Sequence, residues 1–329
     1  MVTHGRHGSV SVIIPCYNYG HFLQDALISL QQQDYPAWEC WVIDDGSTDP
    51  TAEVVKAAAA ADSRIHYVYQ TNQGQPAARN HGLRRASGNY IQFLDADDVL
   101  EPSKFSRQLA WLEDHPGTDI VYGEVRYFRA RDTRDLFLNR WDDAMKDWMP
   151  KVSGQGLTIL TALVENNILE LGCALFKKSI VDKTGSFNAQ LQGVEDYDYC
   201  LRAAMAGARF DFLEEPATNV LMRHHETSYS KNLFFMYKKE LMLRSLLGRQ
   251  LRDASPLARL NTDRYDVRLR RLQDLLIDQV RKGIRRHLKK EEIQWLWKHA
   301  DRKQKLYFFP RIIKAICYHL VNATFNKLN

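Results

Sequence analysis

The chain has 329 residues, which is long enough for one large domain with an appendage or for two domains. Hydrophobic residues make up 45% and charged residues 26%, an ordinary globular composition that indicates neither a disordered nor a fibrous chain. Five scattered cysteines show no CxxC or Cys/His spacing, which argues against a disulfide framework or a zinc site and favours a reducing compartment.

The net charge of +5 is unevenly distributed along the chain. Residues 281–329 contain 13 Lys or Arg and 3 Asp or Glu, a net +10, which leaves −5 for residues 1–280. A basic tail behind an acidic body is typical of a protein with a polyanionic partner. A membrane surface and nucleic acid are the two candidates at this point.

Strands and helices alternate over the first 130 residues. Apolar runs indicate strands, and apolar residues at helical spacing indicate helices between them. The predicted strands cover residues 9–15, 39–44, 65–70, 90–94 and 119–128, and the predicted helices cover residues 20–33, 51–61, 76–86 and 104–115. This order predicts an α/β fold with a mostly parallel, doubly wound sheet.

The periodicity is lost over residues 129–160, a segment that we interpret as a mobile insertion near the site or as a plain surface excursion. The further predicted elements are helices at 158–166 and 197–206 and strands at 172–177, 210–213 and 217–222. From about residue 231 the chain is helical, polar and basic. We therefore expect an α/β domain over residues 1–230 and a basic C-terminal helical region over residues 231–329.

An acidic cluster follows the predicted strand at 90–94. The segment YIQFLDADDVL places Asp95, Asp97 and Asp98 at the strand's C-terminal end, where ligands bind in open α/β sheets. Crowded carboxylates repel one another, and a hard divalent cation that also binds phosphates relieves that repulsion. The segment predicts either a metal–diphosphate site or an Asp-rich turn that caps the next helix.

Five segments of the chain form an ordered series of motifs. In order they read VSVIIPCYNYGHFLQDALISLQQQ, WVIDDGSTD, TNQGQPAARNHGLRRASGNYIQFLDADD, GVEDYDYCLRAAMAG and RHHETSYS. The series resembles the family 2 glycosyltransferases of the GT-A fold, a Rossmann-like fold, over about residues 9–230. Each segment alone is a weak signal, whereas five in the right order are a strong one.

The resemblance implies a nucleotide pocket at the ends of the first two strands. It places Pro15, Tyr17 and Asn18 in that pocket, with Tyr17 packed on the base, although a strand-end tyrosine can simply be half-buried. It also implies that Asp45 accepts the imide N–H of a uracil base. Its neighbours Ser47 and Thr48 also suit a turn and a helix N-cap.

The resemblance also implies a diphosphate and metal site. Arg79, near a helix start, would lie close to the nucleotide, the alternative being a solvent-facing arginine. Asp97 would be a direct ligand of Mg²⁺ or Mn²⁺, and Asp95 would meet the ribose or the metal. Asp98 would serve as a cap on the helix side.

Two further motifs complete the implied site. In the family, the Asp after Glu at the start of a helix is the general base, which places Asp196 as the base and Glu195 beside the donor. An acidic helix start favoured by the helix dipole is the alternative. His225 falls on the family's His position and could reach the metal or diphosphate. Its neighbour His224 leaves open which histidine acts.

Aromatic and aliphatic residues accompany the basic residues of the tail: Trp295, Trp297, Tyr307, Phe308, Phe309, Ile312, Ile313, Ile316 and Tyr318. This mixture suits an anionic lipid surface, a helical subdomain packed on the catalytic body, or a contact in a homo-oligomer. Nucleic acid is not expected as a partner, because no recognition motif accompanies the charge. The apolar stretch at 312–321 is too short to span a bilayer.

Taken together, the sequence predicts an inverting, metal-dependent glycosyltransferase. It would move a sugar from a nucleotide-sugar, a UDP-sugar by the reasoning on Asp45, to a glycan or lipid-linked glycan acceptor in polysaccharide biosynthesis. We expect a cytoplasmic protein, peripheral on the inner face of the cell membrane. A sugar-phosphate nucleotidyltransferase and a non-catalytic nucleotide-sugar-binding module are the alternatives. Dinucleotide and P-loop enzymes are excluded because GxGxxG and GxxxxGK[ST] do not occur.

Overall fold

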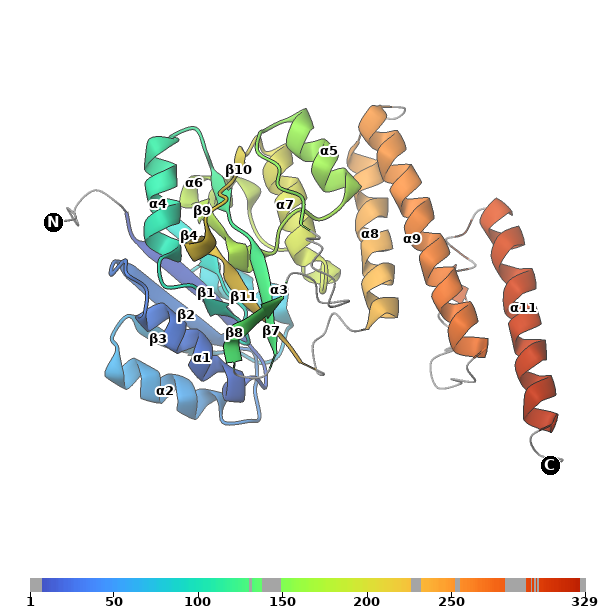
Figure 1. Cartoon of the computed structure of the whole chain (residues 1–329), viewed down its shortest axis with the longest axis horizontal. Helices are drawn as coiled ribbons and strands as arrows, with labels where there is room; N and C mark the ends of the chain where they lie inside the picture. Colours follow the sequence, from blue (N-terminus) through green and yellow to red (C-terminus); the bar gives the residue numbers. More distant parts are fainter. Residues whose placement is uncertain are drawn as a thin grey trace. The chain divides into compact units, whose positions relative to one another are not determined.

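The computed structural model describes residues 8–129, 132–137, 149–225, 232–251, 255–281, 294–296, 298, 300 and 302–325. The chain divides into two compact units, Met1–Lys231 and Asn232–Asn329. Figure 1 shows strands at the centre of the first unit with helices outside them, and helices alone in the described part of the second.

A seven-stranded sheet forms the centre of the first unit, in the order β10-β6-β9-β4-β1-β2-β3. The strand β9 runs antiparallel to both of its neighbours, and the other neighbouring pairs are parallel, so the predicted mostly parallel sheet is confirmed. The strands are β1 (Val10–Cys16), β2 (Trp38–Asp44), β3 (Ile65–Tyr69), β4 (Tyr90–Phe93), β6 (Ile120–Tyr122), β9 (Ala174–Lys177) and β10 (Phe210–Phe212).

Helices cover the sheet in the positions that the alternating sequence pattern predicts. In α1, the residues Leu23, Ala26, Leu27 and Leu30 are buried, as their helical spacing requires. The helices of this unit are α1 (Gly20–Gln31), α2 (Thr51–Ala61), α3 (Gln75–Leu83), α4 (Lys104–Asp114), α5 (Leu157–Glu165), α6 (Lys178–Thr184) and α7 (Glu195–Met205), with short 3-10 turns at Leu171–Cys173, Ala189–Leu191 and Pro216–Thr218. The helix α6 is absent from the sequence-based prediction.

A second, four-stranded sheet corrects the prediction of one strand over residues 119–128. The chain forms β6 and then β7 (Val125–Arg129), which belongs to a sheet of order β5-β11-β7-β8. The break falls at Gly123, where an added Cβ would lie 2.8 Å from the carbonyl oxygen of Thr218. The other strands of this sheet are β5 (Val99–Leu100), β8 (Asp132–Phe137) and β11 (Val220–His224).

The segment 129–160 is therefore not wholly irregular. Its start forms β8, which pairs antiparallel with β7, and its end enters α5. Residues 138–148 lie outside the described residues. The predicted strand at 217–222 begins later than expected, at Val220, because the 3-10 turn Pro216–Thr218 precedes it.

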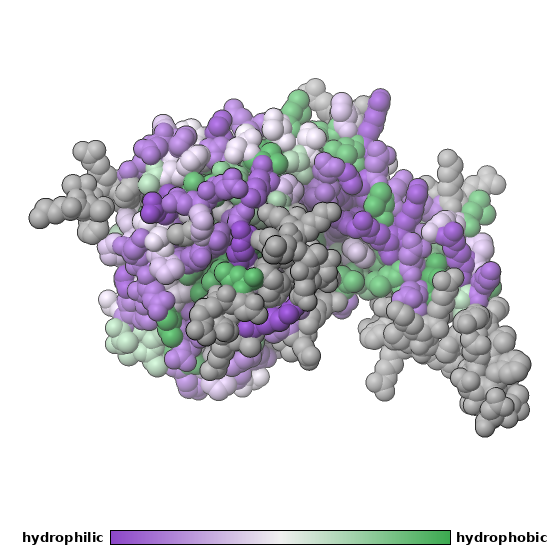
Figure 2. Space-filling view, viewed as in Figure 1, coloured by the Kyte–Doolittle hydropathy of each residue, from purple (hydrophilic) through white to green (hydrophobic). Residues whose placement is uncertain are grey.

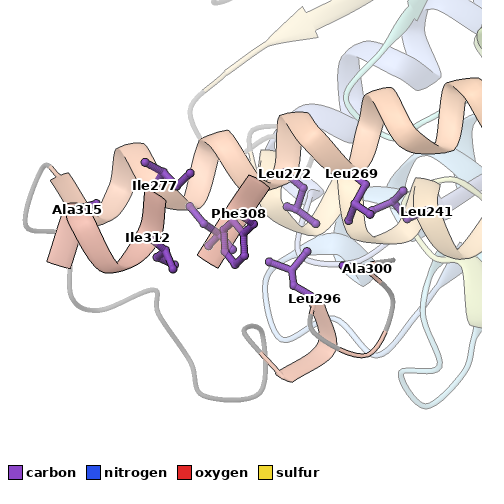
Figure 3. Packing of buried hydrophobic residues seen from close by; sticks show 10 residues of the cluster. Leu241, Leu269, Leu272, Ile277, Leu296, Ala300, Phe308, Ile312 and Ala315 are labelled. Atoms are coloured by element: carbon purple, nitrogen blue, oxygen red, sulfur yellow. The ribbon is translucent and has the colours of Figure 1, made fainter. Parts of the chain in front are cut away.

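The second unit is helical over its described residues, which confirms the predicted C-terminal helical extension. Its long helices are α8 (Leu233–Gln250), α9 (Pro256–Arg281) and α11 (Arg302–Phe325). Figure 3 shows Phe308 of α11 placed among apolar residues that include Leu272 and Leu296. This core also contains Leu241, Leu269, Leu276, Ile277, Ala300, Ile312 and Ala315.

This core revises the expectation for the tail. Phe308 is fully buried and Ile312 is 3% exposed, so neither can face a lipid surface in this structure. Trp297 lies outside the described residues, as do the side chains of Ile316 and Tyr318. Among the described residues, no helix combines the length and apolar character needed to span a membrane. Figure 2 shows hydrophilic residues over much of the visible surface, with hydrophobic residues in smaller groups.

Candidate active site

Asp45 lies directly after β2 and holds the loop that follows β3. Its Oδ1 accepts hydrogen bonds from Gln70 Nε2 at 2.7 Å and from the backbone N–H of Gln73 at 2.8 Å, and its Oδ2 accepts one from the N–H of Gly74 at 2.8 Å. The carboxylate is 3% exposed. Because a carboxylate has about four acceptor positions, these bonds leave capacity for one further donor.

A second layer of hydrogen bonding orients Asp45. His81 Nδ1 on α3 lies 2.7 Å from Gln70 Oε1. Since the Asp45 carboxylate only accepts, Gln70 must turn its amide N–H₂ toward Asp45 and its oxygen toward His81, which then carries a proton on Nδ1. Burial, together with Arg85 and Arg84, lowers the pKa of His81. The sequence reasoning missed this relay, because residues 70 and 81 belong to different elements.

Asn18 joins the loops that follow β1 and β2. It adopts a positive φ of 57°. Its N–H donates to Ser47 Oγ at 2.9 Å, and its Oδ1 accepts from the N–H of Thr48 at 2.8 Å. The helix α2 begins only at Thr51, so the prediction that Ser47 or Thr48 caps it is wrong. Pro15 is buried within β1, and the side chain of Tyr17, directly after that strand, is 48% exposed.

Arg79 connects the acids after β4 to the acids that begin α7. Its Nη2 lies 2.7 Å from Asp95 Oδ1, and its Nη1 lies 2.6 Å from Glu195 Oε1. The guanidinium is 4% exposed, so the alternative of a solvent-facing arginine is wrong. Both carboxylates raise the pKa of Arg79 against the effect of burial. This one side chain brings two sequence-distant acidic motifs into one site.

Asp97 faces the end of β11. Its Oδ2 lies 2.9 Å from His225 Nε2. Its neighbour Asp98 accepts a hydrogen bond from the N–H of Arg223 at 3.0 Å, so the prediction of a helix cap at Asp98 is wrong. Burial, followed by the charges of Asp97 and Asp95, raises the pKa of Asp98 well above its ordinary value. The His225 ring thus contacts Asp97 directly.

Arg223 connects β11 to the acidic loop at residues 95–98. Its Nε donates to the carbonyl oxygen of Asp97 at 3.1 Å, and its Nη2 pairs with Asp25 of α1 at 2.7 Å. The guanidinium also lies over the rings of Phe22 and Phe128, at 4.8 and 4.5 Å from their centroids. The position of His225 beside Asp97 thus depends on an arginine two residues earlier.

Asp196 is the second residue of α7. Asn167 Nδ2 donates to its Oδ2 over a long 3.4 Å. Its side chain is half-buried, and protein atoms surround the carboxylate. Burial, followed by the charges of Glu170 and Glu195, raises the pKa of Asp196 well above its ordinary value. A carboxylate with a raised pKa is a stronger base. Glu170, which the sequence reasoning missed, therefore influences the candidate base, and its only sequence signal is its place directly before the 3-10 turn that leads into β9.

The residues that face Asp97 fit a divalent cation shared with a substrate. Within the part of the chain that the structure describes, no three His, Cys, Asp or Glu side chains are grouped to hold a metal by themselves. His225 Nε2 and Asp97 Oδ2 form a hydrogen-bonded pair at 2.9 Å; a carboxylate suits Mg²⁺ or Mn²⁺, and an imidazole can also bind a divalent metal. Mg²⁺ is usually bound by one or two protein groups plus substrate phosphates.

Comparison with known proteins identifies the family. Residues 11–185, more than half of the chain, match the model of Glycosyl transferase family 2. The chain belongs to this family. This match confirms the resemblance drawn from the five motifs. The protein is therefore a member of the family 2 glycosyltransferase class.

Curated relatives of this glycosyltransferase carry the same class of name. TuaG of Bacillus subtilis, named for teichuronic acid biosynthesis, is 41% identical over 144 residues, which cover 42% of this chain and 57% of TuaG. A glycosyltransferase of Haemophilus influenzae is 32% identical over 164 residues, covering 49% of this chain and 64% of that protein. The chain thus matches about three fifths of the length of each of these relatives.

Solved structures share the GT-A fold at low sequence identity. TarS residues 1–349 of Staphylococcus aureus, solved with UDP-GlcNAc, aligns with a TM-score of 0.60 at 19% identity and covers 97% of this chain and 92% of TarS 1–349. The mannosyltransferase PcManGT of Pyrobaculum calidifontis, solved with GDP-Man and Mn²⁺, aligns with a TM-score of 0.55 at 19% identity and covers 96% of this chain and 88% of that chain. These likenesses confirm the predicted fold.

Proposed function

We propose that this family 2 protein is an inverting, metal-dependent glycosyltransferase that moves a sugar from a UDP-sugar to a glycan or a lipid-linked glycan. One observation carries the proposal: Arg79 bonds both Asp95 and Glu195, at 2.7 and 2.6 Å. This contact joins the acids suited to a metal–diphosphate to the acid pair that contains Asp196. A donor and a base can therefore meet in one site.

Asp196 is the proposed general base. It would take the proton of the acceptor hydroxyl while that oxygen forms a bond to the anomeric carbon. The bond from this carbon to the diphosphate oxygen breaks as the electron pair leaves with the nucleotide. Because the base activates the acceptor on the face opposite the leaving group, the attack of the acceptor oxygen inverts the anomeric centre. The raised pKa of Asp196 suits this role, because a more basic carboxylate accepts the proton more readily.

Asp97 and His225, with Asp95 beside them, are the proposed holders of Mg²⁺ or Mn²⁺. When bound, the ion would supply positive charge that stabilises the departing diphosphate. In the protein itself, Arg79 keeps Asp95 in place, and Arg223 keeps β11 beside the acidic loop. The free acceptor position of Asp45 supports a uracil base as the group recognised at the other end of the donor.

The acceptor and the location of the protein are part of the same proposal. TuaG is named for the synthesis of teichuronic acid, and this name supports a surface polysaccharide as the product class here. Cys16, Cys40, Cys173 and Cys200 are free and buried, which supports a cytoplasmic enzyme in a reducing compartment. We place the enzyme at the inner face of the cell membrane, where a lipid-linked acceptor would be presented.

A transfer assay tests the proposal. The full chain would be given UDP-sugars or GDP-mannose, Mn²⁺ or EDTA, and extracted lipid-linked glycans, with nucleotide release and the anomeric configuration of the product measured. We expect metal-dependent transfer with inversion from a UDP-sugar. Asp97→Ala should abolish the metal-dependent transfer, whereas Asp182→Ala, a change at an exposed acid, should leave it intact. UDP binding without turnover on any acceptor would contradict catalysis and leave a binding module.

A further inference from the structure

The helix α11 has apolar residues on two opposite sides. One side carries Phe308, Ile312 and Ala315, which are buried in the core of the second unit (Figure 3). The other side carries Leu306, whose side chain is 69% exposed, and Ile313, which is 58% exposed. At 100° per residue, Leu306 and Ile313 differ by only about 20° around the helix axis. They therefore form one outward apolar stripe that the core does not use.

Pro310 extends this stripe. It lies four residues after Leu306 on the exposed side of α11. A proline has no N–H, so it cannot donate the usual helical hydrogen bond to the carbonyl oxygen four residues earlier. The stripe thus joins three adjacent positions, Leu306, Pro310 and Ile313, over two helical turns. Exposed apolar residues grouped in this way differ from the single ones that are normal on a protein surface.

Positive charge surrounds the stripe. Residues 302–325 contain five Lys or Arg and no Asp or Glu. Lys314 is exposed and Lys305 is half-buried, and the helical angles place Lys314 on one side of the stripe and Lys305 on the other. Long basic side chains beside apolar residues can extend their charged ends toward lipid phosphates while their stems cover apolar surface. The charge and the apolar stripe are therefore complementary to the same kind of surface.

We propose that the outward face of α11 binds the surface of an anionic phospholipid bilayer, with Leu306, Pro310 and Ile313 at the level of the acyl boundary and the lysines at the phosphates. A second copy of the chain suits this face less well, because it would bring like charges together. Nucleic acid would satisfy the charge and leave the apolar stripe exposed. The inference rests on the membrane location proposed above and is independent of the transfer chemistry.

Vesicle flotation of the full chain tests the inference. The probes are vesicles of phosphatidylcholine alone and of phosphatidylcholine with an equal part of phosphatidylglycerol, at low salt. We expect binding to the anionic vesicles only. Replacing both Leu306 and Ile313 by Ser should weaken it by at least about tenfold. Replacing Lys305 and Lys314 by Gln should weaken it by roughly twenty-five-fold, about fivefold for each cation.

A matched control and two further readouts make the result decisive. Leu157 of the first unit is 72% exposed, and Leu157→Ser should leave vesicle binding unchanged. Equal binding to neutral vesicles, or unchanged binding in both sets of variants, would overturn the proposal. Light scattering that shows an oligomer lost with Leu306 and Ile313, or competition by RNA and not by anionic lipid, would also overturn it. Transfer to a soluble acceptor, measured in parallel, reports separately on the proposed function.

Discussion

Asp45 and Asp196 are two carboxylates of one candidate site, and the protein surrounds them with different groups. Asp45 accepts three hydrogen bonds of 2.7 to 2.8 Å, two of them from backbone N–H groups. Asp196 accepts a long bond of 3.4 Å from Asn167 and one from the backbone of Tyr197, and it lies near the charges of Glu170 and Glu195, which with burial outweigh these donors. Donors stabilise a carboxylate's charge, whereas burial and like charges make it more basic. The contrast suits recognition at Asp45 and proton transfer at Asp196.

The largest expected effect follows from Asp196→Asn. An amide cannot accept the acceptor's proton, so kcat should fall by about 10² to 10⁴-fold while KM for the donor changes little. Steady-state kinetics with a fixed acceptor measure both constants. Asp182→Asn is the control, because Asp182 is an exposed acid that pairs with Lys178. A large rise in donor KM with unchanged kcat would reverse the roles assigned to the two carboxylates.

The stability of the same variant provides a second check. The raised pKa of Asp196 lies above the ordinary value of about 3.9. The folded chain therefore binds this proton more tightly than the unfolded chain. Stability decreases as the pH rises from the pKa of the unfolded chain to the higher pKa of the folded chain. Asn removes this cost, so Asp196→Asn should melt at an equal or higher temperature at neutral pH. A lower melting temperature would mean that the loss of activity reflects damage to the fold.

Asp45→Asn should show the opposite kinetic pattern. Loss of a charged acceptor typically weakens a hydrogen bond by about 1.5–3 kcal/mol, so KM for the UDP-sugar should rise by about ten- to a hundredfold with kcat nearly unchanged. Affinity for UDP alone, measured by calorimetry, should fall by a similar factor. Unchanged UDP affinity would show that Asp45 only organises the loop at residues 70–74.

Gln70→Leu should give a smaller change of the same kind. It removes one of the three bonds to Asp45 and the link to His81, so KM for the donor should rise by about three- to tenfold. Gln73→Ala is the matched control, because Gln73 contacts Asp45 through its backbone N–H and not through its side chain. Equal effects of the two substitutions would contradict the positioning role of the relay.

The smallest effect on rate at neutral pH is expected for Glu170→Gln, within about twofold. Removing this negative charge should lower the pKa of Asp196. The base would then stay ionised to lower pH, and the acidic limb of the kcat/KM profile should move to lower pH. A limb that stays in place would mean that Glu170 does not set the basicity of Asp196.

Residue pattern alone determined most of the central fold, and the resemblance of five motifs to a known family named the residues of the site. The helix at residues 51–61 was predicted with its observed bounds, and the strands β1 to β4 were predicted to within about a residue at each end, because apolar runs and helical spacing act over short distances. The acids Asp95, Asp97 and Asp196 could be named because short motifs carry them. Their roles stay predictions until they are measured.

Tertiary structure alone decided how these groups are paired. Arg79 meets Glu195 across 116 positions of the sequence, and Asp98 meets the backbone of Arg223 across 125. The split of residues 119–128 into β6 and β7, and the turning of Phe308 into the core of the second unit, have the same origin. Local pattern shows that a residue is charged or apolar. Which distant partner offsets its charge or covers its apolar surface depends on packing, which no short stretch of sequence contains.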